Sequence, residues 1–128
     1  MKLAPPSVAK LHQTMKDWDV ADEWERVLYN YLVFGFPPGS FFTAVLAGDF
    51  HRAMANSHPA NTVPAMKALS GWIVNCAPVV CHGDFGAVDY WLGLSDNERR
   101  DWLERAQLIN TEQQDVFLLL KGQSEETV

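Results

Sequence analysis

The chain has 128 residues, of which 48% are hydrophobic and 20% are charged, and its 16 acidic and 10 basic side chains give a formal net charge of −6. This composition excludes a disordered chain, because there is enough apolar surface to offset the entropy that folding costs. The length fits one domain over residues 1–128, with flexible ends at 1–6 and 123–128. The shortage of Lys and Arg argues against binding to a nucleic-acid backbone.

Apolar residues recur at three- and four-residue steps, and no useful stretch alternates with a period of two. The pattern therefore predicts an all-α fold, a compact bundle of six or seven short helices. The first helix is expected to begin at Ser7, a suitable N-cap after two prolines. The second begins near Val20 and ends at Gly35, before the rigid connector 36–39.

The third expected helix is a single one that Ser40 caps and residues 56–59 end. Its apolar stripe consists of Phe42, Leu46, Phe50 and Met54. A fourth helix runs from Val63 to a point before Pro78. Asp84 is expected to cap a fifth helix, and a Ser95–Glu98 capping box opens a sixth. A seventh is expected between residues 111 and 122.

The N-terminal residues carry no uninterrupted apolar run typical of a signal peptide, and no window is long enough for a membrane helix. We therefore expect a cytoplasmic protein that does not contact membranes. Its two cysteines, Cys76 and Cys81, are then expected to be reduced thiols.

Charge is distributed unevenly along the sequence. The 57 residues from Val27 to Gly83 contain only Asp49, Arg52 and Lys67 as charged side chains, whereas acids cluster on both sides. A central pair of helices wrapped by charged ones would explain this, but a small domain rarely covers two helices all round. Charge depletion is also typical of interface cores, and we favour a homo-oligomer that associates through the third and fourth helices. The predicted interface residues are Phe41, Phe42, Val45, Phe50, Met66 and Trp72, with Trp72 as the anchor.

The stretch from Tyr31 to Asp49, YLVFGFPPGSFFTAVLAGD, has a Gly-x-Pro-x-Gly-Ser-Phe motif followed by Ala-Val-Leu. In this it resembles short uncharacterised proteins of phages and prophages, and with Ala77-Pro78 and Trp91 the resemblance covers roughly residues 28–92. It implies a protein that acts in the cytoplasm of an infected bacterium, and it carries no activity to transfer.

The residues suggest three kinds of site. The start of the third helix offers free N–H groups, and Ser40 with Arg52 and Lys67 would suit a small anionic nucleotide. Simple helix capping by Ser40 is the stronger interpretation.

A metal or thiol enzyme would use Cys81, His82 and Asp84. The two cysteines with His82 and His58 lack the paired spacing of zinc sites, and no third group orients a Cys–His pair. We therefore predict no metal, no cofactor and no catalytic residues.

Five acids lie within nine residues, and they would form a compact negative patch able to occupy a basic groove of another protein. A solvated helix end is the simpler explanation. The patch comprises Asp17, Asp19, Asp22, Glu23 and Glu25.

These observations favour a non-enzymatic phage accessory protein that binds, and so blocks or sequesters, a host protein such as a defence factor. The alternatives are an oligomeric sponge for a small nucleotide and, third, the small metal- or thiol-dependent enzyme.

Overall fold

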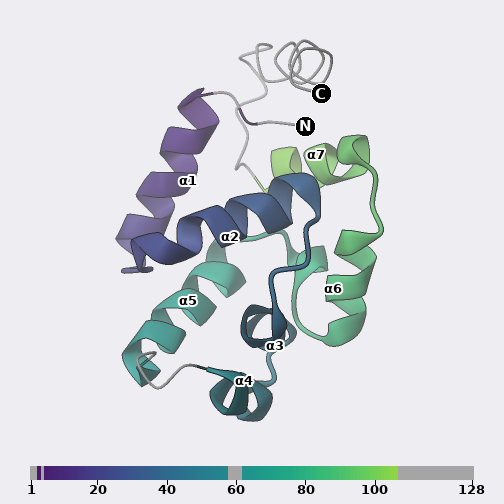
Figure 1. Cartoon of the computed structure of the whole chain (residues 1–128). Coiled ribbons are helices and arrows are strands. Elements are labelled where there is room, and N and C mark those ends of the chain that lie inside the picture. Colours follow the sequence, from purple (N-terminus) through teal and green to yellow (C-terminus); the bar gives the residue numbers. More distant parts are fainter. Residues whose placement is uncertain (1–2, 4, 58–61, 107–128) are drawn as a thin grey trace.

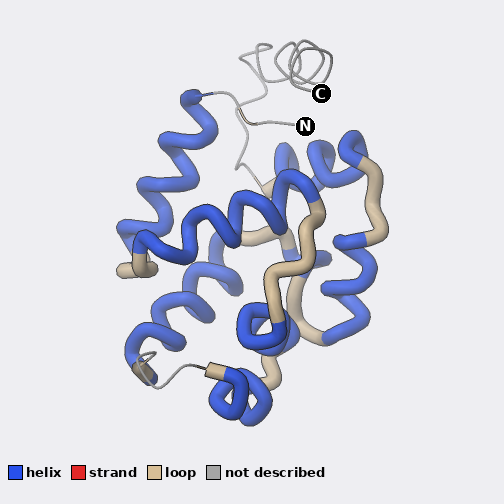
Figure 2. The backbone as a smooth tube through the Cα atoms, viewed as in Figure 1, coloured by secondary structure: helices blue, strands red, loops and turns tan. Residues whose placement is uncertain are grey.

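A computed structural model describes residue 3 and the ranges 5–57 and 62–106. Within these ranges the chain forms seven α-helices and no strand, which confirms the all-α prediction (Figures 1 and 2). None of the helices described is long and apolar enough to cross a membrane. The helix expected between 111 and 122 and the expected tail 123–128 lie outside the described residues.

Helix α1 spans Pro5–Asp17 and buries Ser7, Leu11 and Met15. The prediction that Ser7 caps this helix is wrong, because the helix already begins at Pro5, in the segment expected to be a flexible end. Proline suits the first turn, where its missing N–H would have no helical partner. Ser7 therefore lies inside the first turn and is buried.

The second predicted helix is present but changes type along its length. It consists of the 3₁₀ turn η1 (Asp22–Trp24), the α-helix α2 (Glu25–Tyr29) and the π-helix η2 (Asn30–Phe34). It ends as predicted at Gly35, whose φ of 66° lies in the left-handed region. Glycine is needed there for a second reason, because a Cβ atom would lie 2.7 Å from Nη1 of Arg99.

Arg99 is a charged side chain that the fold buries to 5% exposure. Its Nε donates to the carbonyl oxygen of Val33 at 3.2 Å, and its guanidinium also donates to the carbonyl of Leu94 and to Oδ1 of Asp96. These bonds satisfy a carbonyl that the end of η2 leaves without a helical partner. Through these hydrogen bonds Arg99 connects the end of η2 to the start of the last described helix.

The predicted third helix is wrong in one respect, because the chain forms two helices there instead of one. Helix α3 spans Ser40–Ala47 and helix α4 spans Phe50–Asn56. Gly48 ends α3 with a φ of 77°, and the Asp49 side chain caps α4 by accepting a hydrogen bond from the Arg52 N–H at 3.0 Å. A Gly-Asp pair is a helix stop followed by a helix start, and here it outweighs the continuous apolar stripe.

Ser40 does not cap α3. Ser40 is the first helical residue, and the N-cap position before it is occupied by Gly39, which has no side chain to accept a hydrogen bond. Gly39 has a φ of 91°, which a serine side chain would not favour. The turn after Pro37-Pro38 therefore places the glycine, and not the serine, at the cap.

The remaining helices follow their predicted signals. Helix α5 (Val63–Cys76) ends before Pro78, and the 3₁₀ turn η3 (Val79–Cys81) follows. Asp84 caps α6 (Phe85–Leu92) with a 2.7 Å hydrogen bond from the Ala87 N–H. Ser95 and Glu98 form the predicted capping box at the start of α7 (Asp96–Arg105).

The core surrounds α3, which Figure 1 shows end-on between α5 and α6, with α2 crossing above it. Tyr31, Trp72 and Trp91 are fully buried, and each has a hydrogen-bond partner for its polar atom. The Tyr31 hydroxyl donates to the Cys81 carbonyl at 2.7 Å, and Trp91 Nε1 donates to the Tyr31 carbonyl at 2.8 Å. These long-range bonds fix η2 against η3 and α6, because a buried polar atom left unpaired would be costly.

Candidate binding groove

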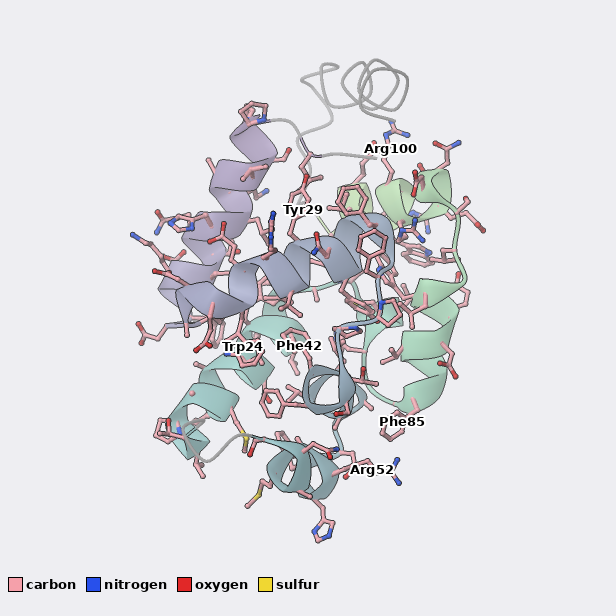
Figure 3. All side chains as sticks on the ribbon, in the orientation of Figure 1. Trp24, Tyr29, Phe42, Arg52, Phe85 and Arg100 are labelled. Carbon is pink, nitrogen blue, oxygen red and sulfur yellow. The ribbon has the colours of Figure 1, made fainter. Side chains whose placement is uncertain are left out.

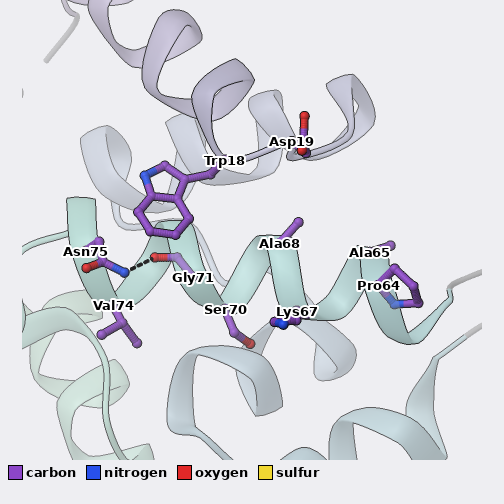
Figure 4. Close-up of a pocket in the computed structure, with 10 residues that line it drawn as sticks. All are labelled: Trp18, Asp19, Pro64, Ala65, Lys67, Ala68, Ser70, Gly71, Val74 and Asn75. Carbon is purple, nitrogen blue, oxygen red and sulfur yellow. Dashed lines mark hydrogen bonds between the residues drawn. The ribbon is translucent and has the colours of Figure 1, made fainter.

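Helix α5 has one buried face and one open face. The buried face carries Met66, Leu69, Trp72 and Ile73. The open face forms the floor of a groove of about 740 Å³ (Figure 4). Along α5 the lining runs from Pro64 to Asn75, which corresponds to roughly 17 Å at the helical rise of 1.5 Å per residue. The groove is lined by Trp18, Asp19, Pro64, Ala65, Lys67, Ala68, Ser70, Gly71, Val74 and Asn75.

The indole of Trp18 forms one wall of this groove and is 39% exposed. It lies over α5 because Gly71 has no side chain: a Cβ atom there would lie 2.9 Å from Cε3 of the indole. The chain turns sharply at Asp19, a non-glycine residue with a φ of 57°. Trp18 is therefore held on the surface of α5 by the turn after α1 and by a glycine that leaves room for it.

The floor of the groove is made of small residues. Ala65, Ala68, Ser70 and Gly71 leave the α5 backbone accessible to a close neighbour, and Val74 beside them is 66% exposed. The Ser70 hydroxyl oxygen is buried and has no hydrogen-bond partner among the described residues. Asn75 donates to the Gly71 carbonyl at 2.8 Å, so one backbone oxygen of the floor is already satisfied (Figure 4). The groove thus combines an aromatic wall, an apolar floor and few open polar groups.

The segment 16–23, whose Trp18 and Asp19 line the groove, is net negative. Its exposed charged side chains are the acids Asp17, Asp19, Asp22 and Glu23 and the base Lys16. Lys67 is the only Lys or Arg among the lining residues. An apolar groove beside such a segment suits a ligand that has apolar side chains flanked by positive charge.

The predicted acidic patch is divided by the structure. Asp17 accepts a 2.9 Å hydrogen bond from Gln13, while Glu25 turns away to accept one from His12 Nδ1 at 2.5 Å. Glu25 and His12 line a different cleft, between α1 and α2, with Leu3, Pro5, Val8, Ala9 and Tyr29. Of the five acids only Asp19 lines the groove beside Trp18. Asp22 lines a separate hollow together with Glu25 and Arg26, and Glu25 also pairs with His12 between two helices.

Four of the six residues predicted to form a self-association interface belong to the core instead. Their exposed fractions are 1% for Phe42, 4% for Val45, 6% for Met66 and 0% for Trp72. Trp72 was expected to be the anchor, but its indole N–H donates to Thr14 Oγ1 at 3.0 Å inside the chain. Side chains that α3 and α5 bury against their own neighbours cannot contact a second molecule.

The other two predicted interface residues have different environments. Phe41 is half-buried, with its ring centroid 5.4 Å from that of Trp24. Phe50 is 50% exposed on α4, and Met54, one turn later, is 57% exposed. Of the predicted set, only Phe50 presents a large open apolar surface.

The residues considered for a nucleotide lie on three helices. Arg52 on α4 has its guanidinium carbon 5.4 Å from the Phe85 ring centroid and pairs with Asp49 at 3.7 Å (Figure 3). Lys67 lines the α5 groove, whose lining includes neither Ser40 nor Arg52. The groove therefore does not assemble the proposed anion-binding group.

The thiol and metal alternatives rest on side chains with other roles. Cys81 is fully buried, and burial raises the pKa of its thiol to about 12, so almost no thiolate exists at neutral pH. Burial also raises the pKa of Cys76, against a hydrogen bond with Trp18 that lowers it. No cluster of three or more His, Cys, Asp or Glu side chains suited to a metal occurs in the described ranges, and His58 lies outside them.

The sequence alone did not predict that Trp18 is exposed or that His12 pairs with Glu25. A tryptophan at helical spacing is core by default, and Trp18 fits the stripe of the first helix. One signal was present: Trp18 lies between Asp17 and Asp19, and two adjacent acids are unusual for a buried position. The His12–Glu25 pair joins two helices and has no signature in the sequence.

No protein-family model, curated protein or solved structure matches the chain.

Proposed function

We propose that the protein acts by binding another protein, and that the groove beside Trp18 takes a segment of this partner with apolar side chains flanked by Lys or Arg. The observation that carries the proposal is an exposed tryptophan that lies over a floor of small residues and belongs to the net negative segment 16–23. Exposed tryptophans in such settings are frequent hot spots of protein interfaces. In this proposal the protein blocks or sequesters its partner and catalyses no reaction.

The resemblance to phage and prophage proteins supports a host protein as the partner and the cytoplasm of an infected bacterium as the place of action. In this proposal the protein occupies a surface that a host component, such as a defence factor, needs for its own function. The net negative charge of the segment 16–23, which includes Trp18, favours a host surface that binds negatively charged ligands, because the two surfaces would be complementary.

The proposal is tested by capturing partners from lysate of infected bacteria with wild-type protein and two variants. Trp18→Ala removes the wall of the groove, and Tyr90→Ala removes a similarly exposed aromatic on α6, which is 48% exposed and outside the groove. A groove partner is retained by wild type and Tyr90→Ala and lost by Trp18→Ala. A partner that all three retain would overturn the groove as the binding site.

A defined probe sharpens the same test. A helical peptide with leucines one turn apart and Lys or Arg at its flanks is titrated by calorimetry, against the same peptide with Glu at the flanks. We expect the basic peptide to bind more tightly, and Trp18→Ala to weaken it by about thirtyfold, the effect of losing a hot-spot residue. Equal binding of the two peptides would contradict the role of the negative charge in the segment 16–23.

A further inference from the structure

We propose that the cleft between helices α1 and α2 is a binding site for a small molecule that carries a protonated amine on an apolar body. This cleft shares no lining residue with the α5 groove, so the inference does not depend on the proposed function. It assigns a ligand class to the pair of His12 and Glu25.

The cleft has the size and the apolar walls of a small-molecule site. Figure 1 shows α1 and α2 diverging from the turn that joins them, and the cleft of about 700 Å³ lies between them. Pro5, Val8 and Ala9 of α1 and Tyr29 of α2 line it. Small-molecule sites in proteins are typically clefts of this volume that are mostly apolar and contain a few polar groups.

The cleft has a polar end and an apolar end. His12 pairs with Glu25 at the polar end, and at the other end the Leu3 N–H donates to the Tyr29 hydroxyl at 3.1 Å. Leu3 is itself buried. Glu25 and Tyr29 are four residues apart and lie on one face of α2, so the two ends are separated by roughly 6 Å along this helix. This length suits a polar head group followed by an apolar body of about six carbon atoms.

The pair at the polar end has unused hydrogen-bonding capacity. Nδ1 of His12 lies 2.5 Å from Oε1 of Glu25, and the two side chains are 42% and 30% exposed. When the imidazole is neutral, its Nδ1–H is donated to the carboxylate and Nε2 carries a lone pair. Within the described ranges, neither Nε2 of His12 nor Oε2 of Glu25 has a hydrogen-bond partner. The pair therefore offers two acceptors to a ligand.

The charge of the cleft comes from Glu25. Among the described residues that line the cleft, Glu25 is the one acid, and there is no Lys or Arg. Arg26 follows it in the chain, but among the described residues the carboxylate forms an ion pair with His12 alone. With a neutral imidazole the cleft therefore carries one negative charge.

A protonated amine matches both properties of this end. Its N–H groups can donate to the two acceptors, and its positive charge balances that of the carboxylate in charge-assisted hydrogen bonds. An alcohol of the same length would gain no attraction between charges, and a carboxylate would be repelled by Glu25. The head group of the ligand therefore decides how tightly it binds, while the apolar walls hold its body.

The test compares hexylamine, hexanol and hexanoate, which share one body and differ in the head group. Binding is followed by NMR titration of isotope-labelled protein at about pH 8, where an ordinary imidazole is neutral and an alkylammonium is charged. Ligands of this size bind weakly, so each probe is titrated up to about 20 mM at constant ionic strength.

We expect hexylamine to bind about tenfold more tightly than hexanol, because of its charge-assisted hydrogen bonds, and hexanoate to bind more weakly than either. The shifted signals should include those of Val8, His12 and Tyr29. If the three probes bind equally, or if the signals of these residues do not shift, the inference is overturned. This comparison uses wild-type protein alone, so it does not depend on the folding of a variant.

Two matched variants assign the charge that selects the amine. Glu25→Gln keeps an oxygen that can accept from His12 but removes the charge, whereas Glu23→Gln removes an exposed acid that does not line the cleft. The preference for hexylamine over hexanol should disappear in Glu25→Gln and remain in Glu23→Gln. Equal losses in the two variants would contradict the assignment. Trp18→Ala, which removes a wall of the α5 groove, should leave amine binding unchanged and so separates this site from the proposed function.

Discussion

Helices α3 and α4 arise from one continuous apolar pattern, yet they have opposite environments. Helix α3 buries Phe42, Ala44, Val45, Leu46 and Ala47, whereas α4 buries only Ala53. The turn at Gly48 and Asp49 changes the direction of the chain, so residues that one straight helix would align no longer face the same neighbours. Both segments are apolar enough to be buried. The direction in which the chain continues after the turn determines that α3 is buried and that α4 is exposed.

The largest expected effect compares two positions of the predicted stripe, Leu46 and Met54. Leu46→Ala should lower the free energy of unfolding by about 3 kcal/mol, because it leaves a cavity in the core. Met54→Ala should change it by less than about 0.5 kcal/mol, because the side chain is mostly in water. Urea denaturation of the two variants measures both values. Similar losses would show that α4 is covered in solution.

The break between the helices can be tested at Gly48. Its φ of 77° is unfavourable for an L residue, while a Cβ atom would meet only the Gly83 carbonyl at 3.6 Å, an ordinary contact. Gly48→Ala should therefore cost about 1–2 kcal/mol of backbone strain, and Gly48→Asn less, because asparagine tolerates this region. If thermal or urea unfolding showed no loss for alanine, the left-handed conformation at Gly48 would not be a source of backbone strain in the variant.

A smaller effect is expected at the cap of α4. Asp49→Ala removes the acceptor for the Arg52 N–H and should cost about 1 kcal/mol, whereas Asp49→Asn keeps a side-chain oxygen and should cost only part of that. The nearby ion pair with Arg52 is exposed and adds little. Because α4 has one buried residue, we expect this loss to appear as local opening in hydrogen exchange before global unfolding.

The smallest expected effect lies beside the end of α3, at His82. This side chain precedes Gly83, whose N–H donates to the Leu46 carbonyl at 2.9 Å, and burial lowers the pKa of its imidazole below 6.5. The unfolded chain then binds more protons than the folded one, so stability is complete above pH 6.5 and falls as the pH drops through the folded pKa.

The control for this pH dependence is His82→Gln. The difference in unfolding free energy between pH 7.5 and pH 5 should be smaller in the variant than in wild type. An unchanged difference would assign the acid sensitivity to other groups.

Much of the fold was predictable because its signals are local. The stop at Gly35, the cap at Asp84 and the capping box of Ser95 and Glu98 depend on residues within one helical turn, and the structure confirms each of them. The caps at Ser7 and Ser40 were wrong for an equally local reason. At Ser7 the preceding prolines begin the helix earlier, and at Ser40 the preceding glycine occupies the N-cap position.

The candidate groove was not predictable, because it depends on which residues meet across the chain. Trp18 and Trp72 both fit helical stripes, and the sequence favoured Trp72 as the open one. The structure buries Trp72 against Thr14 and leaves Trp18 on the surface over Gly71. The burial of Trp72 and the exposure of Trp18 both result from the packing of α1 on α5, which brings together residues more than fifty positions apart.

The sequence by itself determined the all-α class, several of the helix ends and the separation of an almost uncharged centre from acidic flanks, since all of these follow from local chemistry and composition. Only the tertiary structure decided how that centre is divided: α3 is enclosed, α5 is half-covered beside Trp18, and α4 is left open. The physical reason is that burial depends on the direction in which each helix leaves its turn, and a pattern of residue types does not contain that direction.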